Sequence, residues 1–128
     1  MTTSTKPGLL KVVQYSAGAV AALVIVQALM GAGVVISEHT FKDAHGGIGM
    51  LTAACAAVCA VASFMWKGQG GNPGLVGHSI ATAVLCLAQV GLGYSEVRGV
   101  HIGLGFLILV AGVALAAIAF NKPTKTAA

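Results

Sequence analysis

Four long apolar stretches, separated by short polar segments, make up most of the chain. They cover about residues 9–37, 44–66, 75–95 and 100–120. A helix needs about 20 apolar residues to cross a membrane, and each stretch reaches that length. None alternates polar and apolar residues as the strands of a membrane barrel do. The pattern therefore predicts four membrane-spanning helices in a single membrane domain, residues 1–128.

The polar segments that join the stretches are short, at about 38–43, 67–74 and 96–99. Helices joined by short connections pack antiparallel to their neighbours, so the expected fold is all-α, an integral membrane up-down four-helix bundle. The composition agrees, because 57% of the residues are hydrophobic and 8% are charged. A soluble domain carries about 25% charged residues, so a soluble protein is excluded and the lipid bilayer is the expected surrounding.

Lysine and arginine are distributed unequally between the two sides of the predicted bundle. Five lie on the side of the termini and two on the other side: Lys6, Lys11, Lys67, Lys122 and Lys125, against Lys42 and Arg98. Positive residues favour the cytoplasmic side, so we expect an integral protein of a prokaryotic plasma membrane with both termini in the cytoplasm. The cations lie at the ends of apolar stretches rather than in one stripe, so the net charge of +4 does not indicate a nucleic-acid partner.

The second and fourth stretches open with the same motif. Residues Lys42–Gly49 read Lys-Asp-Ala-His-Gly-Gly-Ile-Gly and residues Arg98–Gly105 read Arg-Gly-Val-His-Ile-Gly-Leu-Gly, so both are basic-x-x-His-x-Gly-x-Gly. The stretch before each motif carries Gln-x-x-x-Gly, at Gln27–Gly31 and Gln89–Gly93. Chance similarity in a glycine-rich chain is the alternative. The basic residue three positions before each histidine favours a duplicated helical hairpin, with the second copy shorter at this end.

His45 and His101 begin helices that descend from the same side of the membrane, so they are expected at nearly equal depth. An ionisable side chain in a membrane helix is costly and usually has a function. A neutral imidazole is a good axial ligand for haem iron. Two imidazoles facing each other at one level would bracket one porphyrin, which predicts a haem b with His45 and His101 as its metal ligands. Covalent haem attachment is excluded, because the chain has no Cys-x-x-Cys-His.

Glycines lie near these positions on the same helix faces. Gly49 and Gly105 lie one helical turn below the histidines, where a side chain would strike the macrocycle. Gly31 and Gly93 lie in the same way below the glutamines. We predict that all four glycines border the haem. The alternative is that they only permit close packing of the helices.

Two cations precede the histidines. Lys42 and Arg98 lie three residues before His45 and His101, about one turn nearer the outer water. The propionates of a haem that point outward would meet both cations there, so we predict that they bind the cofactor. Ordinary pairing at the membrane surface with a neighbouring acid, Glu38 or Glu96, is the alternative.

Other polar side chains of the apolar stretches have weaker assignments. Gln27 and Gln89 are expected to donate to a propionate or to bond the imidazole nitrogen that iron leaves free. Hydrogen bonding between helices is the alternative for both. His39 falls in a predicted outer loop and is expected to be solvated. His78 starts the third stretch on the cytoplasmic side, about 20 Å or more away at a rise of about 1.5 Å per residue, so it cannot share the same iron.

With Gln-x-x-x-Gly on one helix and an opening histidine on the next, the chain resembles one four-helix half of the haem A synthase family over about Val24–Gly112. The resemblance implies that histidines on the second and fourth helices hold haem, which correspond to His45 and His101. The catalytic half of that family carries a glutamate where this chain has Lys42, and many members carry a pair of outer-loop cysteines that is missing here. Both departures argue against haem A synthesis and leave haem binding untouched.

Three functions compete on these observations. The first is a small b-type cytochrome that transfers electrons at the outer half of the membrane, as part of a respiratory or redox complex or as a homodimer, with a quinone as one candidate redox partner. The second is a half-size haem-modifying enzyme of the haem A synthase type. The third is an accessory membrane subunit without a cofactor. The repeated histidine motif favours the first.

Overall fold

A computed structural model of the chain describes residues 7–95 and 97–125. Four helices account for most of them: α1 (Pro7–Ile36), α2 (Glu38–Lys67), α3 (Pro73–Gly93) and α4 (Arg98–Asn121). All four are long and apolar enough to cross a membrane. The described residues contain an isolated bridge between Gly71 and Thr124 but no strand. The all-α membrane bundle predicted from the sequence is therefore confirmed.

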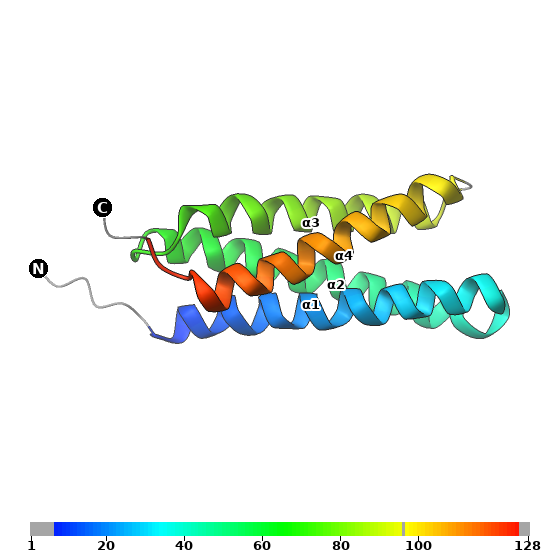
Figure 1. Ribbon diagram of the computed structural model, residues 1–128, viewed down its shortest axis with the longest axis horizontal. Coiled ribbons are helices and arrows are strands. Elements are labelled where there is room, and N and C mark those ends of the chain that lie inside the picture. Colours follow the sequence, from blue (N-terminus) through cyan, green and yellow to red (C-terminus); the bar gives the residue numbers. More distant parts are fainter. Residues whose placement is uncertain (1–6, 96, 126–128) are drawn as a thin grey trace, which may run out of the picture.

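The helices form a ring in which each packs against its neighbours along the chain, and α4 closes against α1. Helices α2 and α4 lie diagonally opposite each other. In Figure 1 the α1–α2 and α3–α4 connections lie at one end of the bundle, called here the histidine end. The start of α1, the end of α4 and the α2–α3 loop lie at the other end, called the terminal end. Two antiparallel hairpins, α1–α2 and α3–α4, thus point the same way.

The expected polar loop over 38–43 is wrong, because α2 already begins at Glu38. The backbone carbonyl of Ser37 accepts hydrogen bonds from the amides of Thr40 and Phe41, at 3.2 and 3.4 Å, which closes the first turn of α2. Lys42 then pairs with Glu38 one turn earlier, at 3.1 Å, as residues four apart on a helix do. Polar residues therefore extend the helix out of the apolar stretch, and the turn between α1 and α2 is made by Ser37 alone.

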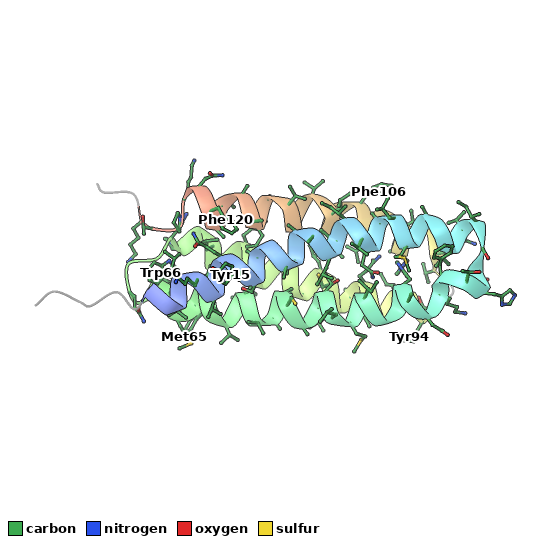
Figure 2. All side chains as sticks on the ribbon, turned by 90° about the horizontal axis from the view of Figure 1, so that it is seen from below. Tyr15, Met65, Trp66, Tyr94, Phe106 and Phe120 are labelled. Atoms are coloured by element: carbon green, nitrogen blue, oxygen red, sulfur yellow. The ribbon has the colours of Figure 1, made fainter. Side chains whose placement is uncertain are left out.

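The second hairpin is shorter at the histidine end, as the spacing of the repeat predicts. Helix α1 continues from Gln27 to Ile36, whereas α3 ends at Gly93, four residues after Gln89. The α3–α4 connection begins at Tyr94, and Figure 2 shows this tyrosine at the end of the bundle opposite Trp66. The first hairpin therefore reaches further at this end than the second.

The terminal end is tied together by hydrogen bonds. The buried Trp66 indole donates from Nε1 to the carbonyl of Pro123 at 2.8 Å. Asn72 donates from its backbone to Pro123 and from its side chain to Lys122, at 3.0 and 2.9 Å. Its side-chain oxygen also accepts from the amide of Gly74 at 2.8 Å and so caps α3. The α2–α3 loop is thereby held against the segment that follows α4.

Small and branched apolar side chains fill the bundle in two clusters. One lies towards the terminal end and includes the fully buried Val13, Leu75 and Leu115. The other includes Val20, Val24, Ala53, Ala56, Ala83, Cys86 and Ile108. Three residues of this second cluster, Val24, Cys86 and Ile108, form part of the floor of the cavity described below.

Gly112 sets the separation of α1 and α4, and replacing it should destabilise the fold. A Cβ at this position would lie 3.0 Å from a methyl group of Val24 and 3.3 Å from one of Val20. Overpacking of this kind costs about 1–3 kcal/mol, so Gly112→Ala should lower the thermal unfolding temperature in detergent. Gly103, on the same helix, has nothing within 4 Å of such a Cβ. Gly103→Ala is the matched control and should leave the temperature unchanged or raise it.

Candidate cofactor site

The two repeated histidines meet across the bundle. His45 on α2 and His101 on α4 come from diagonally opposite helices, and their ring centroids lie 6.0 Å apart with an angle of 73° between the ring planes. Both side chains are half-buried. The backbones of α2 and α4 do not pack against each other, but each helix places a histidine at the same level near the histidine end. The structure brings together the two side chains that the sequence selected as metal ligands.

A cavity of about 1070 Å³ surrounds this point and is lined by all four helices. Pockets for organic ligands measure about 300–1,000 Å³, so the space is large enough for a sizeable organic molecule. Its floor consists of buried residues, one from each helix: Val24, Thr52, Cys86 and Ile108. Its rim consists of exposed polar residues of the histidine end, which include Glu38, Lys42, Ser95 and Arg98.

Within the first hairpin, each glycine makes room for a side chain of the facing helix. A Cβ on Gly31 of α1 would lie 3.4 Å from Cε1 of His45, and a Cβ on Gly49 of α2 would lie 2.8 Å from Nε2 of Gln27. The two helices run antiparallel, so the Gln-x-x-x-Gly of one matches the His-x-x-x-Gly of the other. The histidine lies over one glycine and the glutamine lies over the other.

The second hairpin repeats this arrangement at the matching positions. A Cβ on Gly93 would lie 3.3 Å from Cε1 of His101, and a Cβ on Gly105 would lie 3.1 Å from Nε2 of Gln89. The four glycines named in the sequence motifs therefore first accommodate the protein's own histidines and glutamines. Their expected role beside a macrocycle stays a prediction. The agreement between the hairpins supports duplication of the whole structural unit.

Four buried polar atoms in the cavity have no hydrogen-bond partner among the described residues. They are Nδ1 of His45, Nδ1 of His101, Oε1 of Gln27 and Oε1 of Gln89. Buried polar groups are nearly always satisfied, and an unsatisfied one calls for an explanation such as an absent ligand. The same two atoms are unsatisfied in each hairpin. The cavity therefore contains, from each hairpin, one imidazole nitrogen and one amide oxygen that are free to accept or donate a hydrogen bond.

The cations of the two motifs lie at the rim. The ammonium of Lys42 is 3.1 Å from a carboxylate oxygen of Glu38, and both side chains are largely exposed. Pairing with a neighbouring acid, the alternative weighed for Lys42, is therefore present. Arg98 is exposed in the first turn of α4 and also lines the cavity. Glu96, the acid considered for Arg98, falls outside the described residues. The rim thus carries one cation from each hairpin, together with the carboxylates of Glu38 and Asp43.

The other two histidines lie elsewhere. His39 is exposed in the first turn of α2 rather than in a loop. His78 is half-buried on α3, with Nε2 2.9 Å from the carbonyl oxygen of Ala111, and it does not line the cavity. Among the described residues, no group of three or more His, Cys, Asp and Glu side chains is placed to hold a metal ion. A haem needs only two protein ligands, because the porphyrin supplies the equatorial nitrogens.

The floor of the cavity was not selected from the sequence, although the repeat contains the signal. Val24 and Cys86 lie three residues before the paired glutamines, and Thr52 and Ile108 lie seven residues after the paired histidines. These are the next inward-facing positions on their helices, one or two turns deeper. Comparing the two halves of the chain at these deeper positions, as well as within the motifs, would have identified all four residues from the sequence.

No protein-family model, curated protein or solved structure matches the chain. The functional conclusion therefore rests on the geometry of this cavity and on the motifs that line it.

The glutamine-over-glycine contact gives a test that needs no ligand. Gly49→Ala should push the Gln27 amide aside, because the new methyl group would lie 2.8 Å from its nitrogen. The loss of stability should be smaller in a Gln27→Ala background, with a coupling of about 0.5–3 kcal/mol in a double-mutant cycle of unfolding in detergent. Gly46→Ala is the control, because nothing lies within 4 Å of a Cβ there. Additive effects of Gly49→Ala and Gln27→Ala would contradict the contact.

Proposed function

We propose that the protein is a membrane haem b protein, a small b-type cytochrome in which His45 and His101 are the axial ligands of one haem. One observation carries the proposal. Two half-buried imidazoles from diagonally opposite helices lie 6.0 Å apart, and the Nδ1 of each is buried without a partner. A haem bound between the two rings would be held by one nitrogen of each, at about 2 Å for a bond between a metal and an imidazole nitrogen.

The residues around the histidines suit a porphyrin. The buried floor is mostly apolar and excludes water from the inner edge of the macrocycle, and the rim offers Lys42 and Arg98 to its propionates. A haem iron bound there would supply one-electron redox chemistry. His45 and His101 would fill both axial positions, which leaves no open position for a small-molecule substrate. The residues therefore favour electron transfer over chemistry at the iron.

The resemblance to half of a haem A synthase supports haem binding and not haem modification. The Gln-x-x-x-Gly and His-x-x-x-Gly motifs are present in both hairpins. Lys42 stands where the catalytic half of that family carries a glutamate, so the carboxylate is replaced by a cation. We therefore place the protein among electron carriers, with subunits of a redox complex, a second copy of the chain or a quinone as partners at the histidine end.

The proposal is tested by the spectrum of the purified protein. Bis-histidine ligation predicts a low-spin haem b spectrum in both redox states and little change when carbon monoxide is added to the reduced protein. Incubation with reductant and oxygen, followed by extraction, should return unmodified haem b. A modified haem in the extract would favour the enzyme, and a colourless protein would favour the accessory subunit.

The orientation in the membrane is part of the same proposal, with the histidine end outside and both termini in the cytoplasm. Single cysteines at Thr40 and Val97 should react with a membrane-impermeant maleimide added to intact cells, whereas a cysteine at Gln69 should react only after lysis. Gln69 is preferred to Gly70, whose φ of 95° disfavours a side chain. The native cysteines lie within the helices, so the protein without an added cysteine measures the background labelling. Labelling at Gln69 alone would reverse the orientation.

A further inference from the structure

The Gln89 side chain contacts His101 at two points. Its Nε2 donates to the backbone carbonyl of His101 at 2.8 Å and lies 3.3 Å from Nε2 of the ring. Both contacts are partly buried and join α3 to α4 within one hairpin. The first fixes the amide against the backbone of the helix that carries the histidine. The second places the same amide beside one of the two ring nitrogens.

We infer that Gln27 and Gln89 are positioning residues for the two histidines, each holding one ring nitrogen so that the other is directed to iron. The inference rests on the proposed haem site and goes beyond it, because it assigns a role to two side chains that do not touch the metal. Of the two roles considered for these glutamines from the sequence, it selects the bond to the imidazole rather than the bond to a propionate.

The pattern of unsatisfied atoms supports this assignment. A nitrogen that binds iron has no proton, so a neutral ligating imidazole carries its proton on the other nitrogen and needs an acceptor there. An amide supplies one when its oxygen faces the ring. Since Nε2 of Gln89 makes both contacts with His101, the amide would have to turn over and also move off the His101 carbonyl, giving up the 2.8 Å hydrogen bond there. Oε1 of both Gln27 and Gln89 is buried and has no other partner. Gln89 therefore holds a free acceptor next to its histidine, and Gln27 occupies the matching position of the first hairpin.

The glycine contacts keep each amide within reach. A Cβ on Gly105 would lie 3.1 Å from Nε2 of Gln89, and a Cβ on Gly49 would lie 2.8 Å from Nε2 of Gln27. A larger residue at either glycine would push the amide away from the imidazole. The motifs Gln-x-x-x-Gly and His-x-x-x-Gly then act together in each hairpin. One glycine makes room for the histidine, and the other makes room for the glutamine. The glutamine in turn orients the histidine.

A hydrogen bond from the ring to an amide oxygen makes the imidazole a stronger donor to iron. It stabilises the ferric state more than the ferrous state and lowers the midpoint potential. Partners of this kind are typically worth about 10–100-fold in metal affinity. Removing the glutamine should therefore weaken haem binding and raise the potential, and replacing it by a carboxylate should lower the potential.

The test uses Gln89→Met, Gln89→Glu and the same two changes at Gln27, with midpoint potential and haem dissociation measured on the full chain in detergent. Methionine keeps the length of the side chain without an acceptor. We expect a raised potential and about 10–100-fold faster haem loss for the Met variants, and a lowered potential with retained haem for the Glu variants. Gln14→Met is the matched control: Gln14 donates to the carbonyl of Ala119 at 3.2 Å, does not line the cavity, and should leave both values unchanged.

Unchanged potentials in the Gln27 and Gln89 variants, with haem still bound by both histidines, would overturn this inference and leave the proposed function standing. A shift of the Met and Glu variants in the same direction would also overturn it, because packing alone would then explain the change. If a Met variant does not fold, the Glu variant still tests the inference, because its midpoint potential should be lower than that of the wild-type protein. A wild-type protein without haem would overturn the inference and the proposed function together.

Discussion

Replacing His45 or His101 by alanine is expected to abolish the low-spin haem spectrum. Each substitution removes one coordinate bond to iron, so it should either open an axial position or release the haem. In the first case the spectrum becomes high-spin and the reduced protein binds carbon monoxide. In the second case the purified protein loses most of its colour. The measurement is the absorbance spectrum of each variant with and without carbon monoxide, with haem content per chain.

The remaining histidines provide the controls for this experiment. His78 bonds the carbonyl of Ala111 and lies outside the cavity, and His39 is exposed in the first turn of α2. His78→Ala and His39→Ala should keep the wild-type spectrum. If His45→Ala and His101→Ala also kept it, the ligand assignment would be wrong, and another pair of side chains would have to be found.

Replacing Arg98 by glutamine is expected to weaken haem retention more than replacing Lys42. An arginine that pairs with a propionate makes charge-assisted hydrogen bonds, worth about 1.5–3 kcal/mol, so Arg98→Gln should speed haem loss by about 10–100-fold. Lys42 already pairs with Glu38 at 3.1 Å on an exposed surface, where ion pairs are worth about 0–1 kcal/mol. Lys42→Gln should therefore have the smaller effect. Transfer of haem to apomyoglobin measures both rates.

Neither substitution should change the ligands. The low-spin spectrum should persist in Arg98→Gln and Lys42→Gln, since the histidines remain in place. Lys67→Gln, at the terminal end, controls for the loss of one positive charge. A high-spin spectrum in Arg98→Gln would mean that this residue positions an axial ligand, and equal haem loss in Lys67→Gln would mean that the charge acts non-specifically.

The helices were predictable because crossing a membrane demands long apolar stretches, and the chain contains few residues that break them. The segment 38–43 was not predictable on the same basis. Its polar residues were interpreted as a loop, whereas Ser37 starts the helix and the pair of Glu38 and Lys42 supports its first turn. Hydropathy reports where lipid surrounds a helix. It does not report where the hydrogen-bonded turns end in water.

The meeting of His45 and His101 was predictable from the repeat, because equal positions in two parallel hairpins lie at equal depth. The contacts of Gln27 and Gln89 over the facing glycines were not. They depend on the register of two antiparallel helices, which is set by the turn at Ser37 in one hairpin and the connection beginning at Tyr94 in the other. A motif shows which residues share a helix face, but the offset between two helices follows from the geometry of the turn that joins them.

The most direct test of the central claim is a reduced-minus-oxidised spectrum of the protein purified from its own membranes, combined with extraction and quantification of its haem. We predict one non-covalent haem b per chain, low-spin in both redox states, with His45 and His101 from the same chain as its ligands. Protein isolated in this way without haem would contradict the assignment of a haem site, and the cavity between α2 and α4 would then need another occupant.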